Sequence, residues 1–196
     1  MTDTTRRIRA QCSVSIDGYS SGPGGTAEDT WLYEHAGQES NAAHFEGIWR
    51  GCSTALMGRT NYEGFHSVWP GITADPATDQ RTRALGTWLN EVDKAVVSTT
   101  LTEAPWENSR IFRDLPTAVD TLRSEDGTDV LVLNSASVIQ GLMREDQLDD
   151  LHLAVVPVVL GGGLRLLPDG VSTAWSLESS TTLSHGAVAV HYRRAR

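Results

Sequence analysis

Apolar and polar residues alternate along the first segment of the chain that shows a clear pattern. The apolar positions are Ile8, Ala10, Cys12, Val14 and Ile16, and the polar positions between them are Arg9, Gln11, Ser13 and Ser15. A period of two predicts a β-strand with one face more buried than the other. The strand should end at Asp17-Gly18, and Ser20–Gly25 is typical of a flexible loop.

Further along, helical and strand-like patterns take turns. Helices are predicted from Ser40 (with Ser40 or Asn41 as the cap) to Gly51, after Asn61, and over Arg81–Leu89, Leu115–Leu122 and Ser135–Met143. Strands are predicted over Ser53–Met57, Lys94–Ser98, Val130–Leu133, Leu151–Leu160 (broken at Pro157), Trp175–Leu183 and Ala187–Arg193. Pro70–Gln80 is expected to be a loop, and His185-Gly186 to join the last two strands as a hairpin.

This alternation predicts an α/β protein with a mostly parallel sheet covered on both faces and an antiparallel end. No repeat or linker interrupts the pattern, so residues 1–196 are expected to form a single domain.

Charge and composition exclude several classes of protein. The net charge is −9, which argues against binding to a nucleic-acid backbone. No apolar run approaches the roughly 18 residues that span a bilayer. No secretory signal precedes the first strand, so a cytoplasmic protein with no membrane partner is expected. Cys12 and Cys52 are interpreted as buried thiols, and Arg193, Arg194 and Arg196 as a solvated tail.

Three turns stand out because each follows a predicted strand and opens with small or polar residues. They are Met57–Asn61, Ser98–Thr100 and Leu133–Ser137. In open α/β sheets, ligands bind beyond the carboxyl ends of the strands, where free N–H groups at helix starts favour anions. Arg59 adds a cation. The turns together predict a site for an anionic, nucleotide-like ligand, although each alone is more often an ordinary helix cap.

Other site types lack their patterns. The six histidines do not have the spacing of a zinc site, so no metal is expected. Neither a phosphate-binding P-loop, a G-x-G-x-x-G fingerprint nor a G-x-S-x-G elbow is present.

At these turns the sequence resembles the dihydrofolate reductase-like proteins, in particular the branch related to the reductase domain of bacterial riboflavin biosynthesis. The resemblance covers about Ile8 to Tyr192. It rests on an ordered series of segments: Ser15–Tyr19, Leu56–Glu63, Lys94–Leu101, Val132–Ala136 and Val156–Gly161.

The resemblance implies a three-layer α/β/α fold, with a mostly parallel central sheet and an antiparallel C-terminal strand, that binds NADPH. The implied cofactor-binding residues are Gly58, Arg59, Thr60, Asn61, Ser98, Thr99, Leu133, Asn134, Ser135, Ala136 and Ser137. Three of these depart from the family pattern. Thr99 replaces an arginine that helps to bind the 2′-phosphate, Asn134 replaces a glycine, and Asn61 replaces a threonine. The departure at Thr99 leaves NADH as an alternative cofactor.

On the substrate side, the resemblance and the chain order point to three residues. Trp31 is expected to line a pocket or to serve as an ordinary core or loop anchor, and Glu34 to act as a proton donor if burial raises its pKa. Asp17 is expected to orient the substrate or to serve only as the turn residue of Asp17-Gly18. No acid stands at the family's spacing after Trp31, so reduction of folate itself is not expected.

The resulting hypothesis is a reductase that passes a hydride from NADPH to a C=N or C=O group of a small heterocyclic or sugar-like metabolite. The alternative is a non-catalytic protein that binds a small molecule on the same fold. A flavin or deazaflavin binder is a third reading. The family resemblance also implies a homodimer.

Overall fold

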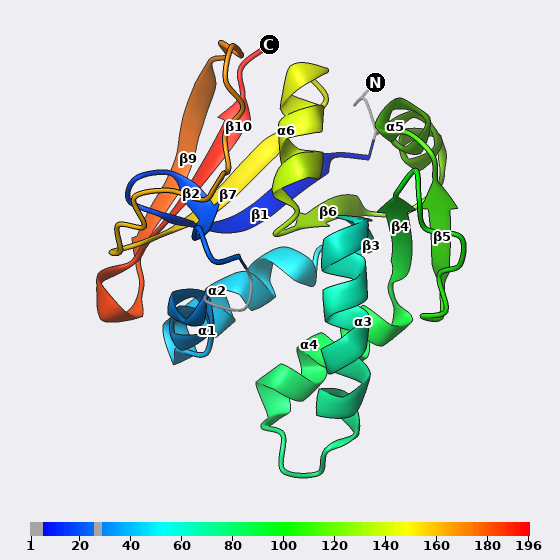
Figure 1. Cartoon of the computed structure of the whole chain (residues 1–196), viewed down its shortest axis with the longest axis horizontal. Helices are drawn as coiled ribbons and strands as arrows, with labels where there is room; N and C mark the ends of the chain where they lie inside the picture. The colour runs from blue at the N-terminus through cyan, green and yellow to red at the C-terminus, as the bar shows by residue number, and fades with distance from the viewer. Residues whose placement is uncertain (1–5, 26–28) are drawn as a thin grey trace.

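The computed structural model describes residues 6–25 and 29–196. Its centre is an eight-stranded sheet in the order β5-β4-β3-β6-β1-β7-β10-β9 (Figure 1). In that order the strands are Ser109–Phe112, Asp93–Val97, Cys52–Gly58, Asp129–Leu133, Ile8–Ser15, Asp150–Val156, Val188–Arg194 and Trp175–Thr182. Neighbours from β5 to β7 pair in parallel, and β10 pairs antiparallel with both β7 and β9. The predicted parallel sheet with an antiparallel end is confirmed.

Helices cover both faces of this sheet (Figure 1). One face carries α1 (Thr30–Ala36), α2 (Glu39–Trp49), α3 (Arg59–Ala74) and α4 (Gln80–Glu91). The other face carries α5 (Leu115–Ser124) and α6 (Ala136–Arg144). Two short strands, β2 (Tyr19–Ser21) and β8 (Leu164–Arg165), form a separate small sheet, and the 3₁₀ turn η1 (Ser184–Gly186) joins β9 to β10.

Two apolar cores lie on opposite sides of the sheet. Residues of α5 and α6, such as Leu122 and Leu142, pack on the apolar side of β1. Residues of α2, α3 and α4, such as Trp49 and Tyr62, pack on β3, β4 and β6. Burial of these side chains is the main favourable contribution to folding. None of the described helices is long and apolar enough to cross a membrane.

Strand β1 has the more buried apolar face that was predicted, but its polar face is also largely buried. Its apolar side belongs to the core under α5 and α6. On its polar side, Gln11, Ser13 and Ser15 are also at most 8% exposed. A central strand has no solvent face, since helices lie over both sides of the sheet. The alternation of apolar and polar residues in β1 therefore separates an apolar buried side from a polar buried side.

The predicted loop at Pro70–Gln80 was wrong at its start, since α3 continues through Pro70 to Ala74. Proline in a helix removes one backbone hydrogen bond. The last part of α3 packs closely on Gly86 of α4. A Cβ on Gly86 would lie 2.1 Å from Thr73 Oγ1 and 3.4 Å from the Trp69 ring, so only glycine allows this approach of the two helices. The short elements α1, β2, β5 and β8 were not predicted, and β2 overlaps the start of the expected loop Ser20–Gly25.

The predicted helix cap at Ser40 or Asn41 was also wrong. Helix α2 begins at Glu39, and Gln38 is its N-cap. The Ser184 backbone N–H instead donates to Ser40 Oγ at 2.7 Å and to Asn41 Oδ1 at 3.2 Å. These side chains therefore tie α2 to η1.

The C-terminal arginines are not a solvated tail. Arg193 pairs with Asp150 at 3.3 Å, Arg194 pairs with Asp146 at 2.7 Å, and Arg196 Nη1 lies 2.6 Å from Asp149 Oδ1. Asp149 and Asp150 are buried, so their charges require these partners.

Candidate functional site

The three turns singled out in the sequence follow β4, β3 and β6, which are adjacent strands of the sheet. Because these strands are parallel, their carboxyl ends meet at one edge. Strand β1 is next in the order, so Asp17 stands at the same edge. The row from β4 to β1 covers three interstrand spacings, roughly 14 Å. The fold therefore brings all three turns into one line.

The turns after β3 and β6 touch each other directly. The Gly58 backbone N–H donates to Ser135 Oγ at 2.9 Å. A Cβ on Gly58 would lie 3.2 Å from Ser135 Oγ and 3.5 Å from Ser137 Oγ. The space beside Gly58 is therefore shaped by the start of α6, and a larger side chain would fill it.

Two asparagines connect the same turns. Asn61 Nδ2 donates to the backbone oxygens of Leu133 at 3.4 Å and Asn134 at 3.2 Å. Asn134 has a φ of 45°, which places it in the left-handed region. Asparagine tolerates that region better than most residues, so it substitutes for glycine at this position.

The helix starts at this pair of turns have no side-chain caps. Neither Gly58 at α3 nor Ser135 at α6 provides a capping hydrogen bond. The first N–H groups of a helix have no partner within the helix, and together with the helix dipole they attract anions. The reading of these turns as ordinary side-chain caps is therefore wrong for α3 and α6.

Arg59 and Thr60 begin α3 and are exposed. Arg59 Nη1 lies 3.1 Å from Glu63 Oε2, one helical turn on. An exposed pair of this kind contributes well under about 1 kcal/mol, so the guanidinium can exchange Glu63 for another anion at little cost.

The turn after β4 is compact. Ser98 Oγ accepts hydrogen bonds from the backbone N–H groups of Thr100 at 3.2 Å and Leu101 at 2.9 Å. Ser98 is buried, whereas Thr99 and Thr100 are exposed. The hydroxyls available to a ligand here are therefore those of the two threonines.

Asp17 is fixed by several hydrogen bonds. Its carboxylate accepts from Ser15 Oγ at 2.7 Å and from the backbone N–H groups of Leu160 at 3.1 Å and Gly161 at 2.7 Å. The bond from Ser15, followed by the backbone bonds, lowers the pKa of Asp17 to about 2. Asp17 is thus an ionised acceptor that holds the segment after β7 against the end of β1.

The two other substrate-side residues lie on α1. Glu34 is exposed, so the burial on which its predicted role as a proton donor depended is absent. Trp31 is half-buried, and its Nε1 donates to Asp29 Oδ1 at 3.0 Å. Asp29 also accepts from Ser21 Oγ and from the Gly22 backbone N–H, so it links Trp31 to the loop after β2.

Sequence analysis did not identify a buried polar layer on the side of β1, β7 and β10 that faces α2. Gln11 is 8% exposed and its Oε1 has no hydrogen-bond partner among the described residues. Its neighbour across the β1–β7 pairing is His152, whose ring stacks on His191 with centroids 3.9 Å apart. Burial above all lowers the pKa of His152 to about 3, so this ring is neutral. The signal was present in the sequence as polar residues inside central strands.

An unpaired buried amide oxygen costs about 1–3 kcal/mol. Gln11 lies beside the turn after β6, since it pairs with Leu133 and its backbone oxygen accepts from the Asn134 N–H at 2.9 Å. The residue that carries the unsatisfied acceptor therefore lies beside the turn after β6, on its β1 side.

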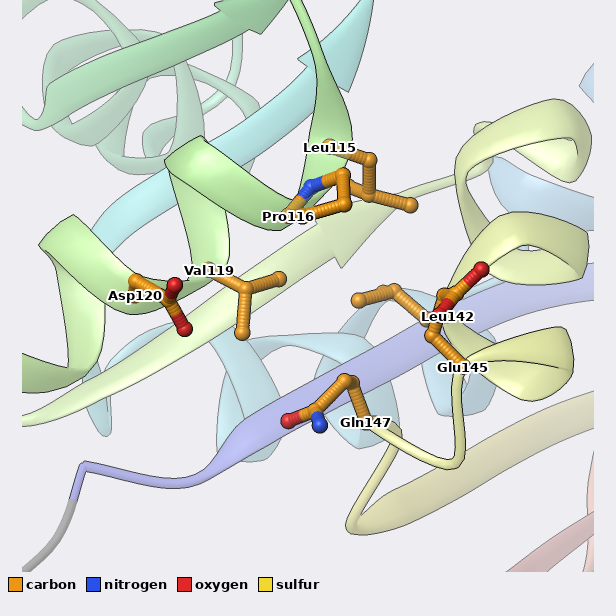
Figure 2. A pocket seen from close by; sticks show the side chains of 7 residues that line it. All are labelled: Leu115, Pro116, Val119, Asp120, Leu142, Glu145 and Gln147. Carbon is orange, nitrogen blue, oxygen red and sulfur yellow. The ribbon is translucent and has the colours of Figure 1, made fainter.

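The described cavities lie elsewhere. Figure 2 shows one of about 70 Å³ between α5 and α6, and its walls are formed by Leu115, Pro116, Val119, Asp120, Leu142, Glu145 and Gln147. That volume suits a few water molecules. A wider groove of about 460 Å³ lies between α3, the end of α4 and the segment before β5. Neither contains a residue of the three turns.

Cys12 and Cys52 are free and buried, as predicted, and burial raises the pKa of both thiols. Within residues 6–25 and 29–196, no three His, Cys, Asp or Glu side chains are arranged to hold a metal ion.

Comparisons with known proteins show which family the chain resembles. The family model of the RibD C-terminal domain matches residues 6–189. The uncharacterized protein YwjB of Bacillus subtilis (strain 168) is 25% identical over 201 residues, which cover 97% of this chain and 99% of YwjB.

Two solved structures share the fold. A Shewanella sp. PV-4 protein named for riboflavin biosynthesis has a TM-score of 0.74 at 19% identity, with 97% of this chain and 99% of that chain covered. A Thermotoga maritima diaminohydroxyphosphoribosylaminopyrimidine deaminase/5-amino-6-(5-phosphoribosylamino)uracil reductase has a TM-score of 0.67 at 14% identity; the match covers 99% of this chain and 58% of the other. The dihydrofolate reductase-like three-layer α/β/α fold is confirmed. Since the family model spans nearly the whole sequence, the chain belongs to the RibD C-terminal domain family.

Proposed function

We propose that the protein is a reductase that uses NADPH to reduce a C=N or C=O group of a small heterocyclic or sugar-like metabolite. Membership of the RibD C-terminal domain family supports an oxidoreductase. The observation on which the proposal depends is the meeting of two uncapped helix starts at Gly58 and Ser135. Such a pair of helix starts suits the pyrophosphate of a dinucleotide.

The residues present fit this cofactor along the whole sheet edge. The pyrophosphate would lie on Gly58–Asn61 and Asn134–Ser137, because Gly58 has no side chain there and the hydroxyls of Ser135 and Ser137 line the space beside it. Arg59 would supply a positive charge to a phosphate. The adenosine would lie toward Ser98 and Thr99, and the nicotinamide toward Leu133 and β1. When bound, NADPH supplies the hydride.

On this arrangement the substrate lies beside β1 and under Trp31. Asp17 orients the loop that closes this end of the site, since it binds the Leu160 and Gly161 N–H groups. The unpaired Gln11 Oε1 would accept a hydrogen bond from the bound molecules. Reduction needs one proton in addition to the hydride, and in this proposal that proton reaches the substrate from solvent on the side of the exposed Glu34.

The test is a titration of tryptophan fluorescence with NADPH and with NADH, using the full chain and the Arg59→Ala variant. We expect saturable binding of NADPH by the full chain, and binding at least several-fold weaker by Arg59→Ala. An absence of binding for both dinucleotides at millimolar concentration would refute the proposal. Unchanged affinity in Arg59→Ala would contradict the assignment of the phosphate site.

A non-catalytic binding protein is the second candidate, and one observation favours it. Asp17 is held as an ionised acceptor and Glu34 is exposed, so neither is placed as a buried proton donor. This candidate predicts that the purified protein retains a small molecule and has no affinity for either dinucleotide. Mass spectrometry of the denatured protein, together with the titration above, distinguishes the two functions.

A further inference from the structure

The turn after β4 is supported by the end of the neighbouring strand β5. The Ser98 backbone N–H donates to the Phe112 oxygen at 2.9 Å. Arg113, the next residue, donates from Nη1 to the backbone oxygens of Ser98 at 3.2 Å and Leu101 at 2.8 Å. The guanidinium is therefore anchored on the turn that carries the exposed Thr99.

This anchoring leaves most of the charge of Arg113 uncompensated. Its two hydrogen bonds go to neutral carbonyl groups, and both come from one nitrogen of a group with five N–H donors. Within residues 6–25 and 29–196, no carboxylate lies within 4.0 Å of it. Arg110, in the preceding strand β5, instead pairs with Glu125 through both terminal nitrogens.

The nearest carboxylate in sequence is occupied elsewhere. Asp114 accepts from the Thr117 backbone N–H at 2.8 Å and caps α5. That bond lowers the pKa of Asp114, so its charge is committed to the helix start. In a chain with a net charge of −9, an anchored arginine with no acidic partner is available for an external anion.

The position of Arg113 at the end of the sheet indicates which part of a ligand it would contact. Strand β5 is the outermost strand, next to β4, so Arg113 lies at the end of the row of turns that is farthest from β1. In the proposed binding mode this is the adenosine end. A phosphate monoester on the adenosine ribose would be accessible to the free N–H groups of a guanidinium, which match a phosphate in a bidentate manner.

We infer that Arg113 determines cofactor specificity by pairing with the phosphate of the adenosine ribose, and so selects NADPH over NADH. The inference rests on the proposed function. A ribose hydroxyl offers no charge to Arg113, so the loss of this residue should weaken NADPH binding and leave NADH binding unchanged.

The experiment measures dissociation constants for NADPH and NADH by isothermal titration calorimetry, with the full chain and the variants Arg113→Ala and Arg113→Lys. The full chain should prefer NADPH at least tenfold. Arg113→Ala should bind NADPH about tenfold more weakly and bind NADH as before, and Arg113→Lys should be intermediate. Thermal unfolding of each variant checks that the turn persists.

Arg144→Ala is the matched control, because it removes one exposed positive charge at the far end of α6. It should leave both dissociation constants unchanged. If both dinucleotides bind but Arg113→Ala keeps the same preference as the full chain, or if the full chain shows no preference, the inference is overturned and the proposed function stands. If neither dinucleotide binds, both are overturned.

Discussion

Helices α4 and α6 differ in which groups form hydrogen bonds with the backbone N–H and carbonyl groups at their ends. At the start of α4, Asp79 accepts hydrogen bonds from the N–H groups of Arg81 and Thr82, both at 3.0 Å. At its end, Lys94 Nζ donates to the backbone oxygens of Asn90 at 3.2 Å and Val92 at 2.8 Å. At the start of α6, by contrast, the Ser135 hydroxyl accepts from Gly58 of another turn, and the helix has no side-chain cap.

The difference follows the location of each helix end. The ends of α4 lie away from the candidate site, and side chains of the protein satisfy both. The starts of α3 and α6 lie at the carboxyl edge of the sheet, where an internal carboxylate cap would occupy the place of a bound phosphate. An open helix start forgoes about 1 kcal/mol of capping stabilisation and leaves an anion site in exchange.

The largest effect concerns Lys94, the one lysine of the sequence, which is fully buried over the Trp106 ring. Burial above all lowers the pKa of Lys94 from 10.5 to about 8. Between pH 8 and pH 10.5, Lys94 is mostly deprotonated in the folded protein and mostly protonated in the unfolded chain. Stability should therefore rise with pH in that interval, by on the order of 3 kcal/mol.

Urea unfolding at a series of pH values, with the full chain and Lys94→Met, measures this contribution. The difference between the two proteins isolates Lys94, because the buried Cys12 and Cys52 thiols, whose pKa values are raised, destabilise the fold above pH 9 in both. A difference that stays constant from pH 7.5 to 10.5 would contradict the role of Lys94 as a buried cation at the end of α4.

The next largest effect concerns Gly58. The variant Gly58→Val should weaken NADPH binding at least tenfold, because its side chain would fill the space between the starts of α3 and α6. The φ of −80° allows other residues, so backbone strain is not expected. Gly47→Ala, an open position in α2, is the control, with unchanged affinity. Full binding by Gly58→Val would place the cofactor elsewhere.

A smaller effect tests α4, the helix whose start is capped by Asp79. Asp79→Ala should lower the free energy of unfolding by about 1 kcal/mol, because two N–H groups of α4 lose their acceptor. Dinucleotide affinity should stay the same, since α4 begins away from the sheet edge. Chemical denaturation and a parallel titration measure both quantities, and a loss of affinity in this variant would remove the contrast between α4 and α6.

The smallest effect gives α6 the acidic first turn that it lacks. Ser137→Asp should raise the free energy of unfolding by roughly 0.5 kcal/mol through the helix dipole. The same charge should repel a phosphate and weaken NADPH binding several-fold. Ser137→Asn, which adds a polar side chain without charge, should change binding less. Tighter NADPH binding by Ser137→Asp would show that no anion lies at this helix start.

The fold was largely predictable from sequence because long periodic segments have strong signals. The continuous apolar runs that became β4 and β6 placed these strands correctly, and Pro157 marked the end of β7. The short strand β5 has four residues, too few for a period to emerge. Pro70 was misread because packing between α3 and the next helix, α4, outweighs the local preference of proline.

The candidate site was predictable only in part. Turns after strands identified Gly58, Asn61 and Ser135, and the structure brings these residues into contact. Arg113 could not be recognised, since β5, the strand that it follows, was not predicted. Gln11 was visible as a polar residue in a strand, but its burial depends on α2, which packs from elsewhere in the chain. Burial, which decided the interpretation of Glu34, is likewise a tertiary property.

The most direct test of the central claim is a two-dimensional ¹H–¹⁵N NMR spectrum of the full chain, recorded while NADPH is added. If the open helix starts bind the diphosphate, the largest shifts should fall on the backbone amides of Arg59, Thr60, Ala136 and Ser137. The amides of Arg81 and Thr82 at the capped start of α4 should stay in place. Shifts confined to α4, or none at saturating NADPH, would contradict the account.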